Sequence, residues 1–268
     1  MIEILSFEFM QHAAIASILV SLICGIIGSL IVINRMVFIA GGIAHGSYGG
    51  IGLALYLGIA PLLGASLFAL FLGGIIAYLT HKNNARLDSL IGVLWAFGMA
   101  FGIIMTDLTP GYNVDLMSYL FGAILSVSGD DLLYMGFIFV MVLAFVLFNY
   151  KQLIAMSFDA QFAKLRGVNT TLLYTLLILM IALSVVMSIR AVGLILVIAL
   201  LTIPPYMAEK LTTSIQGMMI VSSFLSVVFC FIGLLLSYYL NLSAGAAIIL
   251  VATSAFFIQF AAMRFIKY

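Results

Sequence analysis

Residues 35–50 read Arg35-Met-Val-Phe-Ile-Ala-Gly-Gly-Ile-Ala-His45-Gly-Ser-Tyr-Gly-Gly50, so a histidine lies inside a glycine-rich, uncharged run. Small residues spaced four apart let a neighbouring helix approach closely. They also leave space around the imidazole, which binds cations at neutral pH. An ionisable residue in a membrane segment indicates a functional site, and the alternative is a histidine hydrogen-bonded to a neighbouring helix. Residues four apart share a helix face, which gives two adjacent stripes: Gly41, His45 and Gly49, and then Gly42, Gly46 and Gly50.

The composition around this stretch is that of a polytopic membrane protein. Hydrophobic residues make up 66% of the 268 residues and charged residues only 7%, against about half and about a quarter in soluble domains. The net charge of +1 gives no indication of nucleic acid as a partner. Cys24 and Cys230 both lie in apolar runs, and we expect them to pack as small core residues.

The apolar runs predict an all-α fold with about nine transmembrane helices, in a range of eight to ten, because each run is close to the length that crosses a bilayer. Residues 1–268 then form a single transmembrane domain. Residues 115–128 are too few to span comfortably and predict a short re-entrant helix, with a full span as the alternative. The predicted spans are 11–33, 38–58, 62–80, 89–105, 131–149, 171–188, 192–206 (ending at Pro204-Pro205), 214–238 and 244–263.

Positive charges predict the orientation of these spans. With nine spans, Arg190 is the one basic residue on its side, and the other nine Lys and Arg residues fall on the opposite side. This asymmetry predicts an outer N-terminus and a cytoplasmic C-terminus. The outer side then carries acidic residues that suit cations, and Asp107 and Asp115 are candidates for the outer entrance of a cation path, with solvated loop charges as the alternative. For Asp130 and Asp131 we expect a helix-capping role.

Residues 157–168 form a polar segment between two predicted spans on the cytoplasmic side. Asp159 at its start and Lys164 and Arg166 near its end match the helix dipole, and Gly167 is a typical helix stop. These features predict a short amphipathic helix that either rests on the bilayer surface or docks a partner. The chain has no GxxxxGK[ST] phosphate loop, so ATP-driven transport would need another protein to hydrolyse ATP.

Several stretches, taken in order along the chain, resemble the permease subunit of bacterial and archaeal ABC importers for zinc, manganese or iron(II). The resemblance covers about residues 30–260, most of the chain. The matching stretches are Arg35-Met36 with Gly41 to Gly50, Asp115 to Val127 with Tyr119-Leu-Phe-Gly122, Asp159 to Gly167, and Val192-Gly-Leu-Ile-Leu-Val-Ile-Ala-Leu-Leu-Thr-Ile-Pro204-Pro-Tyr-Met-Ala208.

The resemblance implies a multi-pass protein of the cytoplasmic (inner) membrane that works with partners. Two permeases would form the channel as a homodimer, a cytoplasmic ABC ATPase subunit would dock on the coupling helix, and an extracytoplasmic metal-binding protein would deliver the ion. The chain itself would be no enzyme and would hold no permanent cofactor, only the transported metal. The coupling residues implied are Asp159, Ala163, Lys164, Arg166 and Gly167.

One departure from the family pattern concerns the metal path. Many members carry an aspartate four residues before the histidine, and here that position is Gly41. His45 is then the candidate ligand in the translocation path, with Ser47 and Tyr48 as weaker hydroxyl ligands, and two His45 side chains of a homodimer would supply two nitrogens. Manganese prefers oxygen ligands and imidazole suits zinc, so the sequence favours zinc. The glycines expected to pack around this site are Gly41, Gly42, Gly46, Gly49 and Gly50.

Two other functions stay open on the sequence. An ion-coupled secondary transporter typically carries carboxylates inside its spans, and the predicted spans here contain essentially none. A non-transporting membrane assembly protein would not need small residues around a mid-membrane histidine. Co-purification with an ATPase that carries a phosphate loop would separate the importer from both alternatives.

Overall fold

The computed structural model describes residues 8–82, 86–110, 122 and 124–266, and all regular structure in these ranges is helical. Within them, eight helical stretches are long and apolar enough to cross a membrane, and a ninth apolar helix, α10 (Leu194–Glu209), is shorter. The predicted all-α polytopic fold is therefore confirmed. Most of the predicted re-entrant helix at 115–128, including Asp115, lies outside the described residues, and its described end holds the 3-10 turn η2 (Ile124–Ser126).

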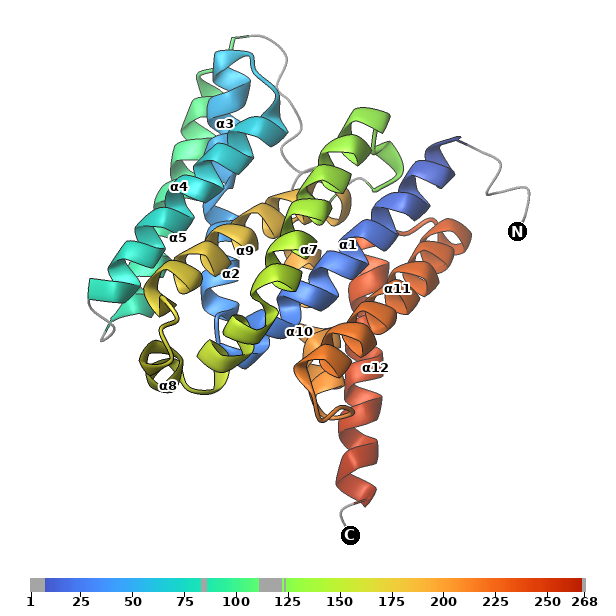
Figure 1. Cartoon of the computed structure of the whole chain (residues 1–268). Coiled ribbons are helices and arrows are strands. Elements are labelled where there is room, and N and C mark those ends of the chain that lie inside the picture. The colour runs from blue at the N-terminus through green and yellow to red at the C-terminus, as the bar shows by residue number, and fades with distance from the viewer. Residues whose placement is uncertain (1–7, 83–85, 111–121, 123, 267–268) are drawn as a thin grey trace. The chain divides into compact units, whose positions relative to one another are not determined.

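The helices follow the predicted spans along the chain (Figure 1), except that α7 continues beyond the predicted end at 149 and ends at Phe158. The second span consists of two helices, α2 (Val37–Gly46) and α3 (Tyr48–Leu57), which meet at Ser47. The remaining helices are α1 (Glu8–Ile33), α4 (Pro61–Lys82), α5 (Leu87–Asp107), α7 (Gly129–Phe158), α8 (Ala160–Leu165), α9 (Thr170–Val192), α11 (Ile215–Leu240) and α12 (Ala244–Ile266).

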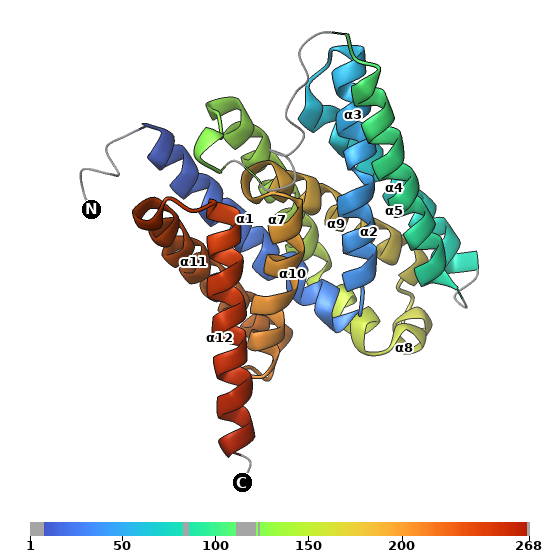
Figure 2. The same ribbon diagram turned by 180° about the vertical axis from the view of Figure 1, so that it is seen from behind.

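The helices divide between two compact units. The first unit holds α1, the first part of α7, the last turn of α9, and α10 to α12. The second unit holds α2 to α5, the rest of α7, α8 and most of α9. Figures 1 and 2 show that in the second unit α3 continues α2, with α4 and α5 alongside them.

In the first unit, α10 runs on to Glu209, whereas the sequence analysis ended this span at the two prolines. Pro205 has no N–H to offer to the carbonyl of Leu201, one turn earlier. Gly28 of α1 lies directly against that carbonyl and against the Pro205 ring. We infer that packing against α1 holds the helix through the prolines, which is why the local signal for a helix end failed here.

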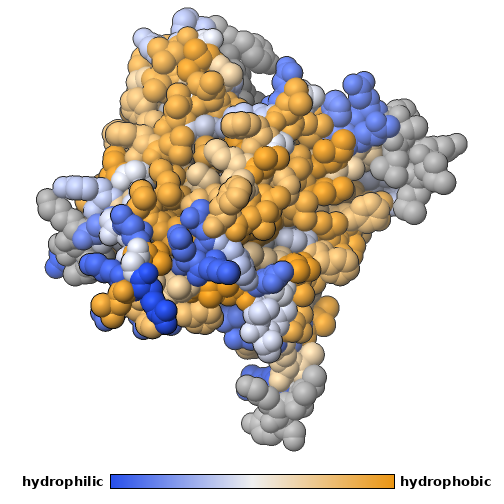
Figure 3. All heavy atoms as spheres, in the orientation of Figure 1, coloured by the Kyte–Doolittle hydropathy of each residue, from blue (hydrophilic) through white to orange (hydrophobic). Residues whose placement is uncertain are grey.

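Large apolar side chains remain exposed on the outer faces of several helices. Examples are Phe97 on α5, Phe137 and Phe148 on α7, and Phe257 on α12. In Figure 3 hydrophobic side chains cover most of the visible surface, and hydrophilic ones gather in two areas, one around α8 and one at the upper right. Soluble proteins rarely expose apolar surface of this extent, whereas a bilayer covers it with acyl chains. The surface therefore agrees with a multi-pass membrane protein.

Candidate functional site

His45 lies in the last turn of α2, and a neighbouring carbonyl fixes its imidazole ring. The Nδ1 atom is 2.9 Å from the carbonyl oxygen of Gly41, one turn earlier. A carbonyl oxygen only accepts hydrogen bonds, so Nδ1 carries the proton and donates it. The neutral ring then has its free lone pair on Nε2, the atom that can bind a metal ion. Gly41 therefore contributes its backbone oxygen to the site in addition to its small size.

Trp95 of α5, which no sequence pattern singled out, stacks on the His45 ring. The two ring centroids are 3.9 Å apart and the ring planes are inclined by 29°. The indole Nε1 donates to the sulfur of Met99 at 3.0 Å. This hydrogen bond fixes the orientation of the Trp95 ring. The imidazole is therefore held by a hydrogen bond at one edge and by an aromatic ring on one face. A signal was present, because Trp95 is the only tryptophan in the chain.

Close contacts between glycines explain why Trp95 lies beside His45. The backbone of Gly98 on α5 touches that of Gly46, and Gly102 lies against the backbone at the start of α3. Any side chain at these glycines would collide with the opposite backbone. Since Trp95 lies one turn before Gly98, it is on the same face of α5. The close approach of the two helices therefore brings the indole onto the imidazole.

The other glycines of the two stripes are also packing positions. Gly42 lies against the side chain of Ile91 on α5, and Gly49 faces the carbonyl of Gly98. Gly50 instead faces Gly64 on α4. The stripes thus allow two helices to approach α2 and α3, as their spacing predicts.

Ser47 and Tyr48, the two weaker ligand candidates, belong to the junction between α2 and α3. Ser47 is fully buried, and its hydroxyl donates to the carbonyl of Ala44 at 2.7 Å. It lies two residues after His45 and therefore on the opposite side of the helix. Tyr48 is buried at the start of α3. A metal-binding role for either hydroxyl stays a prediction.

A helix is present in the polar segment as α8, shorter than the predicted 157–168 because residues 157 and 158 still belong to α7. Its start at Asp159 and its stop at Gly167 are where the sequence predicts them. The Asp159 carboxylate accepts from the backbone N–H groups of Gln161 at 3.0 Å and Phe162 at 2.9 Å, which is an N-cap. Gly167 has a φ of 84°. Its N–H donates to the Lys164 carbonyl, and the N–H of the next residue donates to the Ala163 carbonyl, which is a Schellman stop.

The side chains of α8 divide into an anchored and a free side. Ala163 is fully buried and anchors the helix to the second unit. Phe162 and Leu165 are exposed, Leu165 to 87%, and the Arg166 guanidinium lies 5.1 Å from the centre of the Phe162 ring. Lys164 is exposed as well. This free surface combines apolar and basic side chains, which fits either a partner protein or the bilayer surface.

The acidic residues considered from the sequence lie far from His45 along the chain. One of them ends a helix and another caps a helix. Asp107 is the exposed last residue of α5. Asp131 takes part in the N-terminal cap of α7, as predicted. In the part of the chain that the structure describes, no group of three or more His, Cys, Asp and Glu side chains could hold a metal ion. For His45, the hydrogen bond of Nδ1 leaves Nε2 as the ligand atom.

A helical multi-pass protein with an oriented intramembrane histidine and a short capped helix between two spans has the features of a membrane permease. The chain belongs to the ABC 3 transport family, whose model matches residues 6–263. This confirms the resemblance to the permease subunits of metal-ion ABC importers.

Similar proteins match over almost the whole chain. An uncharacterized membrane protein of Synechocystis sp. is 49% identical over 98% of this chain and 94% of its own length. A manganese transport system membrane protein of Listeria monocytogenes is 33% identical over 96% of this chain and 91% of its own. The solved structure of PsaBC from Streptococcus pneumoniae in complex with a Fab has a TM-score of 0.87 and 31% identity, and the match covers 97% of this chain and 94% of that chain.

Proposed function

We propose that the protein is the permease subunit of an ATP-driven importer for a divalent transition metal ion, and that His45 binds the ion during passage. The observation that carries this proposal is the Nε2 lone pair of His45, which the Gly41 carbonyl and the Trp95 ring orient inside an apolar span. One or two imidazoles completed by water form a weak site. A transport path needs such a site, because the ion must also leave.

The identity of the metal is the finer part of the proposal. The named relative from Listeria monocytogenes is a manganese transport protein, which favours manganese. The position four residues before His45 is a glycine and supplies no carboxylate, and an imidazole ligand alone favours zinc. We take manganese as the first metal to test and zinc as the second, with iron(II) as the third.

ATP-driven import of a metal ion requires partner proteins. A separate ATPase subunit hydrolyses ATP and docks on the free surface of α8, where Phe162 and Leu165 are exposed beside Arg166. An extracytoplasmic metal-binding protein delivers the ion to the outer side. Two copies of the permease line the path, so that two His45 side chains contribute to it.

Metal uptake by the permease reconstituted with its ATPase and binding protein tests the proposal. We expect ATP-dependent uptake of one of the three metals by the wild type and at least a tenfold loss with His45→Ala. His81→Ala is the matched control, because His81 is a second histidine of the same unit, lies near the end of α4 and contacts Thr175 and Tyr174 of α9 instead of Trp95. Uptake at the wild-type rate by His45→Ala would refute the role of His45. Uptake without any ATPase would favour the secondary transporter instead.

A further inference from the structure

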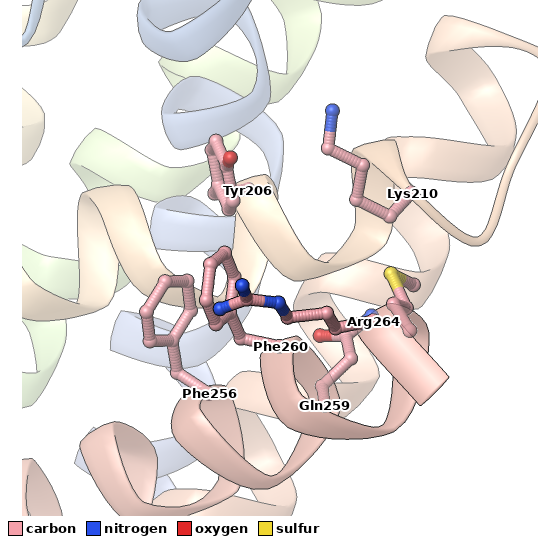
Figure 4. A pocket seen from close by; sticks show the side chains of 7 residues that line it. Tyr206, Lys210, Phe256, Gln259, Phe260 and Arg264 are labelled. Carbon is pink, nitrogen blue, oxygen red and sulfur yellow. The ribbon is translucent and has the colours of Figure 1, made fainter. Parts of the chain in front are cut away.

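A pocket of about 360 Å³ opens in the first unit between the ends of α10 and α12 (Figure 4). Three aromatic rings form its apolar wall. The ring centroids of Tyr206 and Phe256 are 5.8 Å apart, and those of Phe256 and Phe260 are 6.3 Å apart. None of these residues takes part in the candidate metal path, so the pocket needs a separate explanation.

The two helices that form the pocket are joined by one of its lining residues. The side-chain amide of Gln259 donates to the carbonyl of Met207 at 3.2 Å, which ties α12 to α10. Met207 itself is buried in a hydrophobic cluster with Phe229 and Ala252. The aromatic wall is therefore a fixed feature of the unit rather than a chance gap between two surface helices.

Two cationic side chains lie at the rim of this apolar wall. The Lys210 ammonium nitrogen is 5.3 Å from the centre of the Tyr206 ring, a cation–π contact. Arg264 comes from the last turn of α12, and its side chain also lines the pocket (Figure 4). No acid is among the residues that line the pocket; Glu209, the neighbour of Lys210, lies outside the lining. The pocket therefore carries two positive charges above an apolar wall.

The position of the pocket in the membrane identifies what it can bind. Lys210 and Arg264 belong to the basic side of the protein, which the positive-inside rule places at the cytoplasmic surface. The lipids of that leaflet include anionic ones, and basic pockets between transmembrane helices bind their head groups. We propose that this pocket binds one anionic phospholipid of the inner leaflet. Its phosphate lies between Lys210 and Arg264, and an acyl chain runs along Phe256 and Phe260.

Native mass spectrometry of the purified full-length permease, titrated with phosphatidylglycerol, tests this inference. We expect one phosphatidylglycerol to bind the wild type with high occupancy and phosphatidylcholine to bind much more weakly. The double variant Lys210→Gln/Arg264→Gln should bind phosphatidylglycerol about 30-fold more weakly, which corresponds to about 1 kcal/mol for each charge. Lys151→Gln is the matched control, because Lys151 is an exposed basic residue of the same membrane side in the other unit.

Each other outcome would overturn the inference in its own way. Equal binding of phosphatidylglycerol and phosphatidylcholine would mean that the cations play no part. Complete displacement of the lipid by millimolar inorganic phosphate would mean that the pocket is a site for free anions. If the double variant altered only the monomer–dimer ratio, the pocket would belong to a contact between two copies. Metal uptake does not enter this test, so its result is independent of the proposed function.

Discussion

The guanidinium of Arg190 lies 3.1 Å from the carboxylate of Asp131 and joins the last turn of α9 to the first turn of α7. The same carboxylate accepts from the backbone N–H of Ser128 at 3.1 Å, and the Ser128 hydroxyl accepts from the Asp131 N–H at 3.2 Å, which completes a capping box. Asp131 thus caps the N-terminus of α7 and also forms an ion pair with Arg190. Arg190 is the one basic residue of the predicted outer side, and its charge is compensated there.

Two substitutions at Asp131 separate its two roles. Asp131→Asn keeps an acceptor for the cap but loses the ion pair, and we expect it to lower the free energy of unfolding by about 0.5–1 kcal/mol. Asp131→Ala loses the cap as well, and should cost about 1 kcal/mol more. Thermal unfolding of the purified protein in detergent measures both. In an Arg190→Gln background the Asn substitution should cost nothing further, and an undiminished cost there would argue against the ion pair.

The stacking of His45 on the only tryptophan of the chain makes metal binding visible by fluorescence. Mn²⁺ is paramagnetic, and bound at His45 Nε2 it would lie next to the Trp95 indole and quench its emission. We expect saturable quenching in the wild type at submillimolar Mn²⁺ and its loss in His45→Ala. His12→Ala is the control, since His12 belongs to the first unit and its imidazole contacts the Val127 carbonyl there. Equal quenching in wild type and His45→Ala would mean that the ion binds elsewhere.

Because Gly98 contacts Gly46, we expect that even a methyl group at position 98 lowers the stability of the protein. Gly98→Ala places a methyl group against the Gly46 backbone, and overpacking of this kind costs about 1–3 kcal/mol. Gly92 lies on the same helix with open space around it. Gly92→Ala should therefore stabilise α5 by about 0.5–1 kcal/mol, because alanine is the better helix former. Unfolding in detergent compares the two, and equal effects would show that the close approach has no energetic weight.

The helix stop at Gly167 allows a test of coupling. Gly167→Val puts a β-branched residue at a φ of 84°, which strains the backbone by about 1–3 kcal/mol and should distort the end of α8. We expect normal membrane insertion but loss of metal-stimulated ATP hydrolysis in the assembled transporter. Gly167→Asn is the control, because asparagine tolerates this conformation. Unchanged stimulation in Gly167→Val would count against docking on α8.

Local signals in the sequence were enough to predict the spans and α8. Each span is a long apolar run, and α8 is bounded by Asp159 and Gly167, whose side-chain and backbone chemistry act within a few residues. Such features depend on neighbours along the chain and are therefore readable without a fold. The end of α10 was predicted wrongly, because the continuation through Pro205 depends on Gly28 of a different helix.

Contacts between distant segments could not be predicted from one sequence. His45 and Trp95 are fifty positions apart, and the periodicity of each helix leaves open which faces meet. The Arg190–Asp131 pair is similar, because its two residues are 59 positions apart. The positive-inside rule identified Arg190 as the one basic residue on the predicted outer side. That rule concerns the distribution of charges between loops and does not predict which acid pairs with Arg190. The pattern therefore identified His45 but not the ring that orients it.

The contact between Gly28 and Pro205 also restricts how this chain can diverge. A side chain at position 28 would meet both the Leu201 carbonyl and the proline ring. Whether a substitution is tolerated at one of these positions then depends on the residue at the other. A larger residue at position 28 is tolerated only after α10 has changed around position 205. The two sites form an epistatic pair, and their joint history is expected to differ from that of the exposed residues around them.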